Sequence, residues 1–183
     1  MVLGGMKRLK WTKKSVCIVF IVSLMAIGHL VLGMGWVKPP KNFIVFNKTE
    51  SLPPGYYVAV PMNEIHTGDL VVFDLPEDMK CYAVDRGWMG ADEPLLKKVG
   101  AVEGDTFQVD DRFFSINGKY VGPIFNKDSQ GLPMPKKLRG SFEVPKGYIL
   151  PIAPRRPNSF DGRYFGAVPL SSVKAKVIPL ITF

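Results

Sequence analysis

One serine lies in a stretch of sequence whose backbone has little freedom. Ser51 stands two residues before a Pro-Pro-Gly run at 53–55. Each proline fixes its own φ angle and biases the preceding residue toward an extended conformation. The Ser51 hydroxyl is therefore presented on a stiff segment, and Thr49 offers a second hydroxyl close by. An isolated serine before prolines is most often a surface turn, so a chemical role requires partners elsewhere in the chain.

Two adjacent lysines offer a candidate base. Lys97 and Lys98 lie within the apolar, β-prone run that begins at Leu95. Neighbouring side chains on a strand point to opposite faces, so one lysine can face inward while the other faces solvent. Burial favours the neutral amine and lowers its pKa, and a neutral amine can act as a general base. The residues alone do not decide which lysine faces inward, and a solvated strand edge is the commoner role for such a pair.

A third polar stretch, at 157–166, contains Ser159, Asp161 and Arg163 among aromatic residues. Asp161 and Arg163 are two positions apart, so in an extended chain their side chains share a face. We expect an ion pair between them. Such a pair would brace the loop whatever the role of Ser159, and a purely structural loop is the alternative.

The elements that must position these groups begin with a basic and then apolar amino-terminal segment. Five cations and no acid precede residue 15, and 16–35 contains no charged side chain. Twenty helical residues at about 1.5 Å each span a hydrocarbon core of about 30 Å. The basic flank predicts a cytoplasmic tail (1–15), an inner-membrane anchor (16–35), a linker (36–46) and a periplasmic domain (47–183). A cleaved signal peptide is the alternative.

The net charge of +8 does not indicate nucleic acid, because the amino-terminal tail supplies most of it. The two histidines, His29 and His66, have no metal-ligand spacing to the two cysteines. We therefore expect no metal site and no cofactor. Cys17 lies at the cytoplasmic edge of the predicted anchor and Cys81 lies in the outer domain, so the two cannot meet and we expect no internal disulfide.

Beyond the linker the sequence predicts short antiparallel strands. Sixteen prolines and eighteen glycines punctuate the chain, and no long stretch after residue 40 has a helical period. Strands are expected at 56–61, 69–75, 107–109, 112–116 and 119–121, as a strand-turn-strand at 142–150, and at 173–178. Asn117-Gly118 predicts a tight hairpin, and 129–139 reads as an exposed loop. The fold class is therefore mainly β, behind one N-terminal transmembrane helix.

Together these stretches resemble the Ser/Lys signal peptidases of bacteria, and most closely the TraF-type peptidases of plasmid conjugation systems. The resemblance covers residues 47–178 and follows the family order. Its motifs are Ser-Leu-Pro at 51–53, Thr-Gly-Asp-Leu-Val-Val-Phe at 67–73, Asp-Arg-Gly-Trp-Met at 85–89, Leu-Leu-Lys-Lys at 95–98 with Gly-Asp at 104–105, Val-Pro-Lys-Gly-Tyr at 144–148, and Ser-Phe-Asp-Gly-Arg-Tyr-Phe-Gly at 159–166. Two departures are Ala-Pro-Arg at 153–155, where the family often has Gly-Asp-Asn, and Gly162, where a serine is common.

The resemblance implies a signal-peptidase-like serine endopeptidase with Ser51 as nucleophile. It selects Lys97 as the base, eight residues before the aspartate of the Gly-Asp turn. It also implies that the Ser51 N–H and the Thr49 hydroxyl hold the oxyanion, and that Ser159 orients the amine. The remaining support residues of the implied site are Asp161 and Arg163.

The substrate implied by the resemblance is a pilin precursor, or another exported preprotein, which is cut and in some relatives closed into a ring. Conjugative type IV secretion components would be partners. Two other functions stay open at this point. A general type I signal peptidase would act on many exported proteins. A non-catalytic pilus-assembly scaffold would not require a serine, a lysine and a second serine in these three motifs.

Overall fold

The computed structural model describes residues 13–33, 44–135 and 138–183, without the side chains of 28–33. The chain divides into two units, the first ending at Lys41. The described part of the first unit is helix α1 (Lys13–Gly33). Among the described residues, no helix has both the length and the apolar character that a membrane crossing needs.

The predicted anchor stays a prediction. Most of the predicted cytoplasmic tail, the end of the anchor and most of the linker lie outside the described residues. The second unit begins at Asn42 and contains the rest of the chain.

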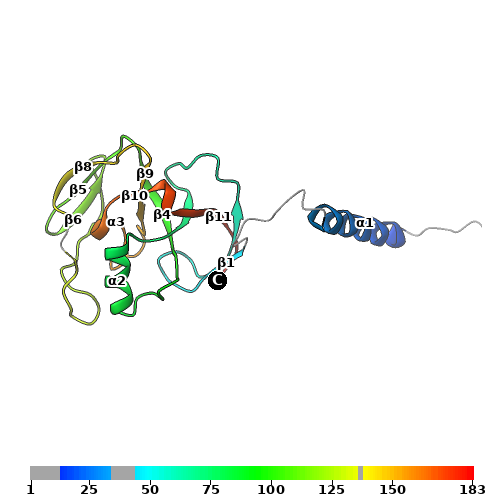
Figure 1. The fold of residues 1–183 in the computed structure, drawn as a ribbon, viewed down its shortest axis with the longest axis horizontal. Helices are drawn as coiled ribbons and strands as arrows, with labels where there is room; N and C mark the ends of the chain where they lie inside the picture. The colour runs from blue at the N-terminus through cyan, green and yellow to red at the C-terminus, as the bar shows by residue number, and fades with distance from the viewer. Residues whose placement is uncertain (1–12, 34–43, 136–137) are drawn as a thin grey trace, which may run out of the picture. The chain divides into compact units, whose positions relative to one another are not determined.

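The second unit is built on two antiparallel sheets. The seven-stranded sheet has the order β1-β2-β11-β3-β4-β9-β10, and the four-stranded sheet has the order β7-β6-β5-β8. In Figure 1 the small sheet lies at one end of this unit and β1 at the other. The strands are β1 (Ile44–Asn47), β2 (Gly55–Val60), β3 (Leu70–Phe73), β4 (Leu95–Val102), β5 (Thr106–Val109), β6 (Phe113–Ile116), β7 (Lys119–Pro123), β8 (Gly140–Glu143), β9 (Tyr148–Ile152), β10 (Val168–Pro169) and β11 (Val173–Thr182). The prediction of a mainly β domain is confirmed.

The predicted hairpin at Asn117-Gly118 is present. Asn117 has φ 49° and Gly118 has φ 72°, so both take the left-handed conformation of a tight hairpin turn. Ile116 pairs with Lys119 directly across the turn. Two strands were not expected, β1, which begins inside the segment predicted as a linker, and the short β10.

Helical turns are the main departure from the prediction. The short helices are α2 (Glu77–Asp85), α3 (Gly162–Phe165) and the 3-10 turn η1 (Leu170–Ser172). Two acidic residues, Glu77 and Asp78, stand in the first turn of α2, where their negative charges interact favourably with the helix dipole. Met79 and Ala83, four residues apart, form its buried side. Because only two of its residues are buried, the apolar positions of α2 do not repeat often enough to reveal a helix in the sequence.

The predicted exposed loop 129–139 is only partly correct. Met134 in this loop is buried. The loop is tied to α2 and its end, because the Tyr82 hydroxyl and the Arg86 guanidinium both donate to the Pro133 carbonyl. Arg86 also pairs with Asp128 at 2.8 Å. These contacts join segments distant in the sequence, so local composition did not reveal them.

Strand β4 is the element on which the core is organised. Its neighbours are β3 on one side and β9 on the other. Its side chains enter three apolar clusters: Val99 packs with Val71 and Met79, Ala101 with the small sheet, and Leu96 with Tyr57. A side chain on this strand is therefore held with little freedom, and this strand carries both lysines.

Candidate functional site

Asn47, at the end of β1, shapes the loop that carries Ser51. Its side chain is 5% exposed. The amide nitrogen donates to the carbonyls of Thr49 at 2.9 Å and Leu52 at 3.0 Å. The amide oxygen accepts the Thr49 N–H at 3.1 Å and the Thr49 hydroxyl at 2.8 Å. Tyr57 anchors the far end of the loop, because its hydroxyl donates to the Pro53 carbonyl at 2.7 Å.

Sequence reasoning did not select Asn47 as a site residue. It is the first residue of the Asn-x-Thr-x-Ser-Leu-Pro segment. The signal available was an Asx residue placed before a turn, a type that commonly bonds to nearby backbone.

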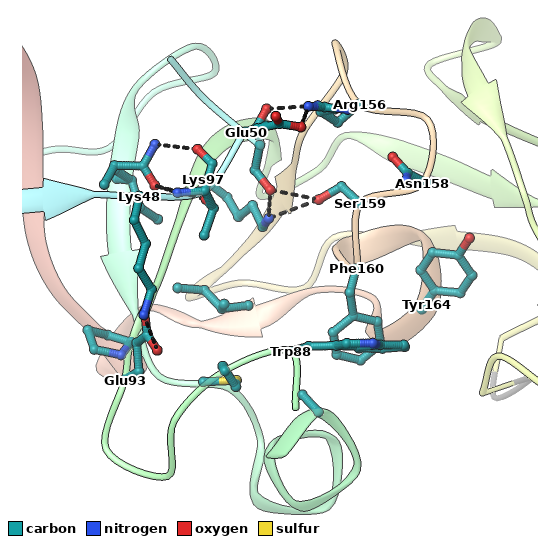
Figure 2. A pocket seen from close by; sticks show the side chains of 18 of the residues that line it. Lys48, Glu50, Trp88, Glu93, Lys97, Arg156, Asn158, Ser159, Phe160 and Tyr164 are labelled. Carbon is teal, nitrogen blue, oxygen red and sulfur yellow. Dashed lines mark hydrogen bonds and ion pairs between the residues drawn. The ribbon is translucent and has the colours of Figure 1, made fainter. Parts of the chain in front are cut away.

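The structure brings Ser51, Lys97 and Ser159 together from three separate elements. The Lys97 Nζ lies 2.6 Å from the Ser51 Oγ and 2.9 Å from the Ser159 Oγ. The two serine oxygens are 3.1 Å apart. Figure 2 shows the Lys97 amine with a dashed line to the Ser159 hydroxyl. The three polar groups therefore form a closed triangle.

The register of β4 decides which lysine enters this triangle. Lys97 pairs with Val71 of β3 and is only 4% exposed. Lys98 pairs with Leu70, is half-buried and points to the other face. Of the two lysines, Lys97 is therefore the one whose amine reaches Ser51 in this structure.

Burial changes the acid-base chemistry of the amine. It lowers the pKa of Lys97 to about 8, while the charge on Asp161 raises it and the charge on Arg163 lowers it further. A lysine with this pKa is substantially neutral in mildly alkaline solution. Its lone pair can then accept a proton from a hydroxyl at hydrogen-bond distance.

Asp161 and Arg163 form the ion pair expected from the sequence. Asp161 is fully buried and Arg163 is 3% exposed. The guanidinium Nε and Nη2 donate to the two carboxylate oxygens at 2.9 and 2.8 Å. The same guanidinium also donates to the carbonyls of Pro157 and Arg156, each at 2.7 Å. The pair therefore holds the loop that presents Ser159.

Thr49 does not face Ser51 in this arrangement. Its hydroxyl donates to Asn47, and among the described residues it makes no hydrogen bond to Ser51. Thr49 nevertheless lines the cleft in front of Ser51 that is described below. Its predicted role would require the hydroxyl to leave Asn47.

Gly162, one of the two departures from the family pattern, has a steric reason. A Cβ there would lie 2.7 Å from the Pro151 carbonyl oxygen and 2.8 Å from the Leu150 Cδ1. These contacts are too close for any side chain without movement of β9. At the other departure, the Ala153 N–H donates to Asp161 at 2.8 Å, so the site keeps its brace with alanine at that position.

A cleft of about 380 Å³ opens in front of the triangle. We call it the apolar cleft, after the side chains of its walls, which include Val45, Trp88, Leu96, Met134 and Phe160. Figure 2 shows Trp88 and Phe160 packed beside each other, with Lys48 and Glu93 in contact at the rim. A mostly apolar cleft beside a nucleophile suits apolar side chains of a peptide.

The sequence is similar to those of known proteins. The family described as signal peptidase, peptidase S26, matches residues 9–181. The plasmid transfer protein TraF of Escherichia coli is 30% identical over 148 residues, which are 75% of this chain and 82% of the relative. Signal peptidase I V of Bacillus subtilis strain 168 is 27% identical over 113 residues, 57% of this chain and 59% of the relative.

A solved structure also matches. The crystal structure of a signal peptidase I from Enterococcus faecalis V583 has 21% sequence identity and a TM-score of 0.38, and the match covers 64% of this chain and 100% of that chain. The resemblance drawn from the sequence motifs is confirmed by the family match and by the TraF relative. The chain belongs to the signal peptidase family, peptidase S26, and is of the TraF type.

Proposed function

We propose that this protein is a membrane-anchored serine endopeptidase with Ser51 as nucleophile and Lys97 as general base. The observation that carries the proposal is the buried Lys97 amine, 2.6 Å from the Ser51 hydroxyl. A lysine in this position is activated by desolvation, and a serine is activated by a base at this distance. A non-catalytic scaffold would have no need for a buried lysine, which is costly to keep in a core.

In the proposed reaction, neutral Lys97 takes the proton of Ser51 as its Oγ attacks the scissile carbonyl. The ammonium then gives the proton to the departing amine, which leaves an acyl-enzyme on Ser51. Water, activated by the same amine, resolves this intermediate. Ser159 lies 2.9 Å from the amine and keeps it aimed at Ser51 throughout.

The oxyanion in this mechanism is held by the Ser51 backbone N–H and the Thr49 hydroxyl. Substrate binding would have to turn that hydroxyl away from Asn47, with which it is bonded at 2.8 Å. Loss of one oxyanion donor typically lowers kcat by about 10²–10³. Asp161 and Arg163 serve the site as a brace for the Ser159 loop.

The substrate we propose is a pilin precursor of a conjugation system, which is cut and then released linear or closed into a ring. The proposal is supported by the relative named as a plasmid transfer protein. Other components of conjugative type IV secretion would be its partners. A general signal peptidase acting on many exported proteins is the second candidate, favoured by the relative named as a signal peptidase.

We place the enzyme at the inner membrane, with a cytoplasmic amino end and a periplasmic catalytic domain. The basic and then apolar amino-terminal sequence supports this orientation. The edge of the large sheet supports it as well, because Ile44, Phe46, Tyr56, Ile178 and Ile181 are all 45% or more exposed. Cross-strand pairing puts them on one face of β1, β2 and β11. Such an apolar face suits a membrane surface.

Mass spectrometry of the host pilin tests the proposal directly. The pilin would be compared in cells with the wild-type protein, with Ser51→Ala and without the protein. We expect uncut precursor in the last two and a cut product, linear or cyclic, in the first. Identical pilin in all three would exclude the pilin as substrate. If many exported proteins instead keep their signal peptides in the Ser51→Ala cells, the general signal peptidase is the correct function.

A further inference from the structure

A second hollow lies on the other side of the nucleophile. It has a volume of about 460 Å³ and is walled by the segment after Ser51, the turn at Gly68 and strand β11. Among the described residues, Ser51 alone lines both this hollow and the apolar cleft. On the proposed function, a peptide that crosses Ser51 must place its acyl side in one hollow and its leaving side in the other.

Most charged side chains of the apolar cleft are paired within the protein. Lys48 pairs with Glu93 at 3.1 Å, and Arg156 pairs with Glu50. Asp128, at the same wall, is paired with Arg86. Apart from the Lys97 amine, Lys127 is the one charged side chain of this cleft for which the described residues supply no acidic partner. The apolar character of the cleft makes it the place for the small side chains before the cut.

The second hollow has the opposite character, and we call it the basic hollow. Three cations line it, Lys98, Arg155 and Lys176, against the single carboxylate of Asp69. That carboxylate is already used, because it pairs with Lys176 at 2.7 Å. Within the part of the chain that the structure describes, no acidic group pairs with Lys98 or Arg155. Two positive charges therefore remain without a protein counter-charge.

Lys98 is positioned by the same strand that positions the base. Its backbone is fixed between Leu70 of β3 and Ile152 of β9. The Gly68 N–H donates to the Val99 carbonyl at 2.8 Å, which locks the turn against β4. A Cβ at Gly68 would lie 3.9 Å from the Lys98 Cε, so the lysine stem lies across this turn. The cation is thus built into the hollow, at a fixed separation from Lys97 along β4.

We propose that the basic hollow binds a carboxylate on the leaving side of the substrate, held by Lys98 and Arg155. The carboxylate is either an Asp or Glu side chain shortly after the cut, or the free carboxyl end of a short leaving segment. Both sources present the same anion to the same cations. An extended segment advances about 3.3 Å per residue, so the anion belongs within a few residues of the scissile bond.

The test uses full-length protein in detergent and synthetic peptides with alanine at the first and third positions before the cut. The short leaving segment carries Glu, Gln or Lys, and ends in a carboxylate or an amide. The enzymes are wild type, Lys98→Gln, Lys98→Glu and Arg155→Gln. Lys119→Gln is the matched control, because Lys119 is an exposed cation of β7 and lines neither hollow.

Wild type and Lys119→Gln should cleave carboxylate-bearing segments about fivefold faster in kcat/KM than the matched amides, the upper range for one exposed ion pair. Lys98→Gln and Arg155→Gln should each weaken this preference, and Lys98→Glu should prefer Lys in the leaving segment. A Glu-over-Gln preference identifies a side-chain carboxylate, and an acid-over-amide preference identifies the chain end. Equal rates for all segments in the wild type would overturn the proposal, as would a preference that survives in Lys98→Glu.

A binding measurement separates this proposal from the proposed function. If none of the peptides is cleaved, the peptidase assignment is in question, but the hollow can still be tested. Fluorescence anisotropy of a labelled leaving segment should then give a Kd about fivefold lower with Glu than with Gln in the wild type, the effect of one exposed ion pair. The difference should be smaller in Lys98→Gln and in Arg155→Gln. Equal Kd values in the wild type would refute the carboxylate site independently of catalysis.

Discussion

Replacing Lys97 is the sharpest test of the proposed mechanism, because the structure sets a size for the effect. Burial lowers the pKa of Lys97 to about 8. At a pH equal to this pKa, half of the Lys97 amine is neutral, whereas an ordinary lysine, with a pKa of about 10.4, is less than about 1% neutral. Positioned general bases contribute about 10²–10⁴ in rate, and we expect Lys97→Ala to lose that much or more.

Two further substitutions show whether the proton or the position of Lys97 matters. Lys97→Arg should be as inactive as Lys97→Ala, because arginine does not give up its proton. Lys98→Ala, on the same strand, should lose less than about tenfold, since Lys98 would bind the leaving side through one ion pair and take no part in proton transfer. The assay is cleavage of the pilin precursor by purified full-length variants, with folding checked by circular dichroism.

The pH dependence gives an independent check of the same base. The amine must be unprotonated to act, so kcat/KM should be highest above the pKa and fall as the pH drops through about 8.

Activity that survives in Lys97→Ala but is lost in Lys98→Ala would show that the wrong lysine has been chosen. Activity that survives in both would refute the Ser/Lys mechanism itself.

Three other substitutions probe the support of the site. Lys97→Met should stabilise the fold near neutral pH, by up to about 3 kcal/mol at about 1.4 kcal/mol per pKa unit. Because the folded-state pKa of Lys97 is lowered, this gain should be complete below pH 8 and disappear toward pH 10.4, measured by denaturant unfolding across that range. Asp161→Asn should lower the unfolding free energy by about 3–5 kcal/mol, because it leaves the Arg163 charge buried and unpaired; an unchanged midpoint would contradict this. Asn47→Ala should lower kcat with a folded domain, and unaltered cleavage would show that the loop does not need Asn47.

The sequence allowed much of the site to be predicted, because strand alternation and motif order carry over to geometry. The two lysines on one strand had to face opposite ways, and Lys97 is the one that meets Ser51. The Asp161–Arg163 pair followed from a separation of two residues. What could not be read was how closely Ser51 and Ser159 approach, since 108 residues separate them in the chain.

The features that sequence reasoning missed depend on long-range contacts. The Asn47 side chain hydrogen-bonds to three residues, Thr49, Leu52 and Pro53, and it is buried where β1 pairs with β2. Helix α2 has only two buried residues, which are too few to show a helical pattern of apolar positions in the sequence. Met134 is buried by the attachment of its loop to Arg86, a contact across 47 residues at Pro133. In each case tertiary packing, and not local propensity, decided the outcome.

The ion pair below the site explains how a buried carboxylate can coexist with a lysine that must lose its proton. Asp161 alone would hold the Lys97 amine in its charged form, and its charge does raise the pKa. Arg163, bonded to both carboxylate oxygens, acts in the opposite sense on the same amine. Because the two charges oppose each other, burial remains the largest influence on Lys97. The charged pair thus braces the Ser159 loop and still leaves Lys97 able to lose its proton, as the proposed reaction requires.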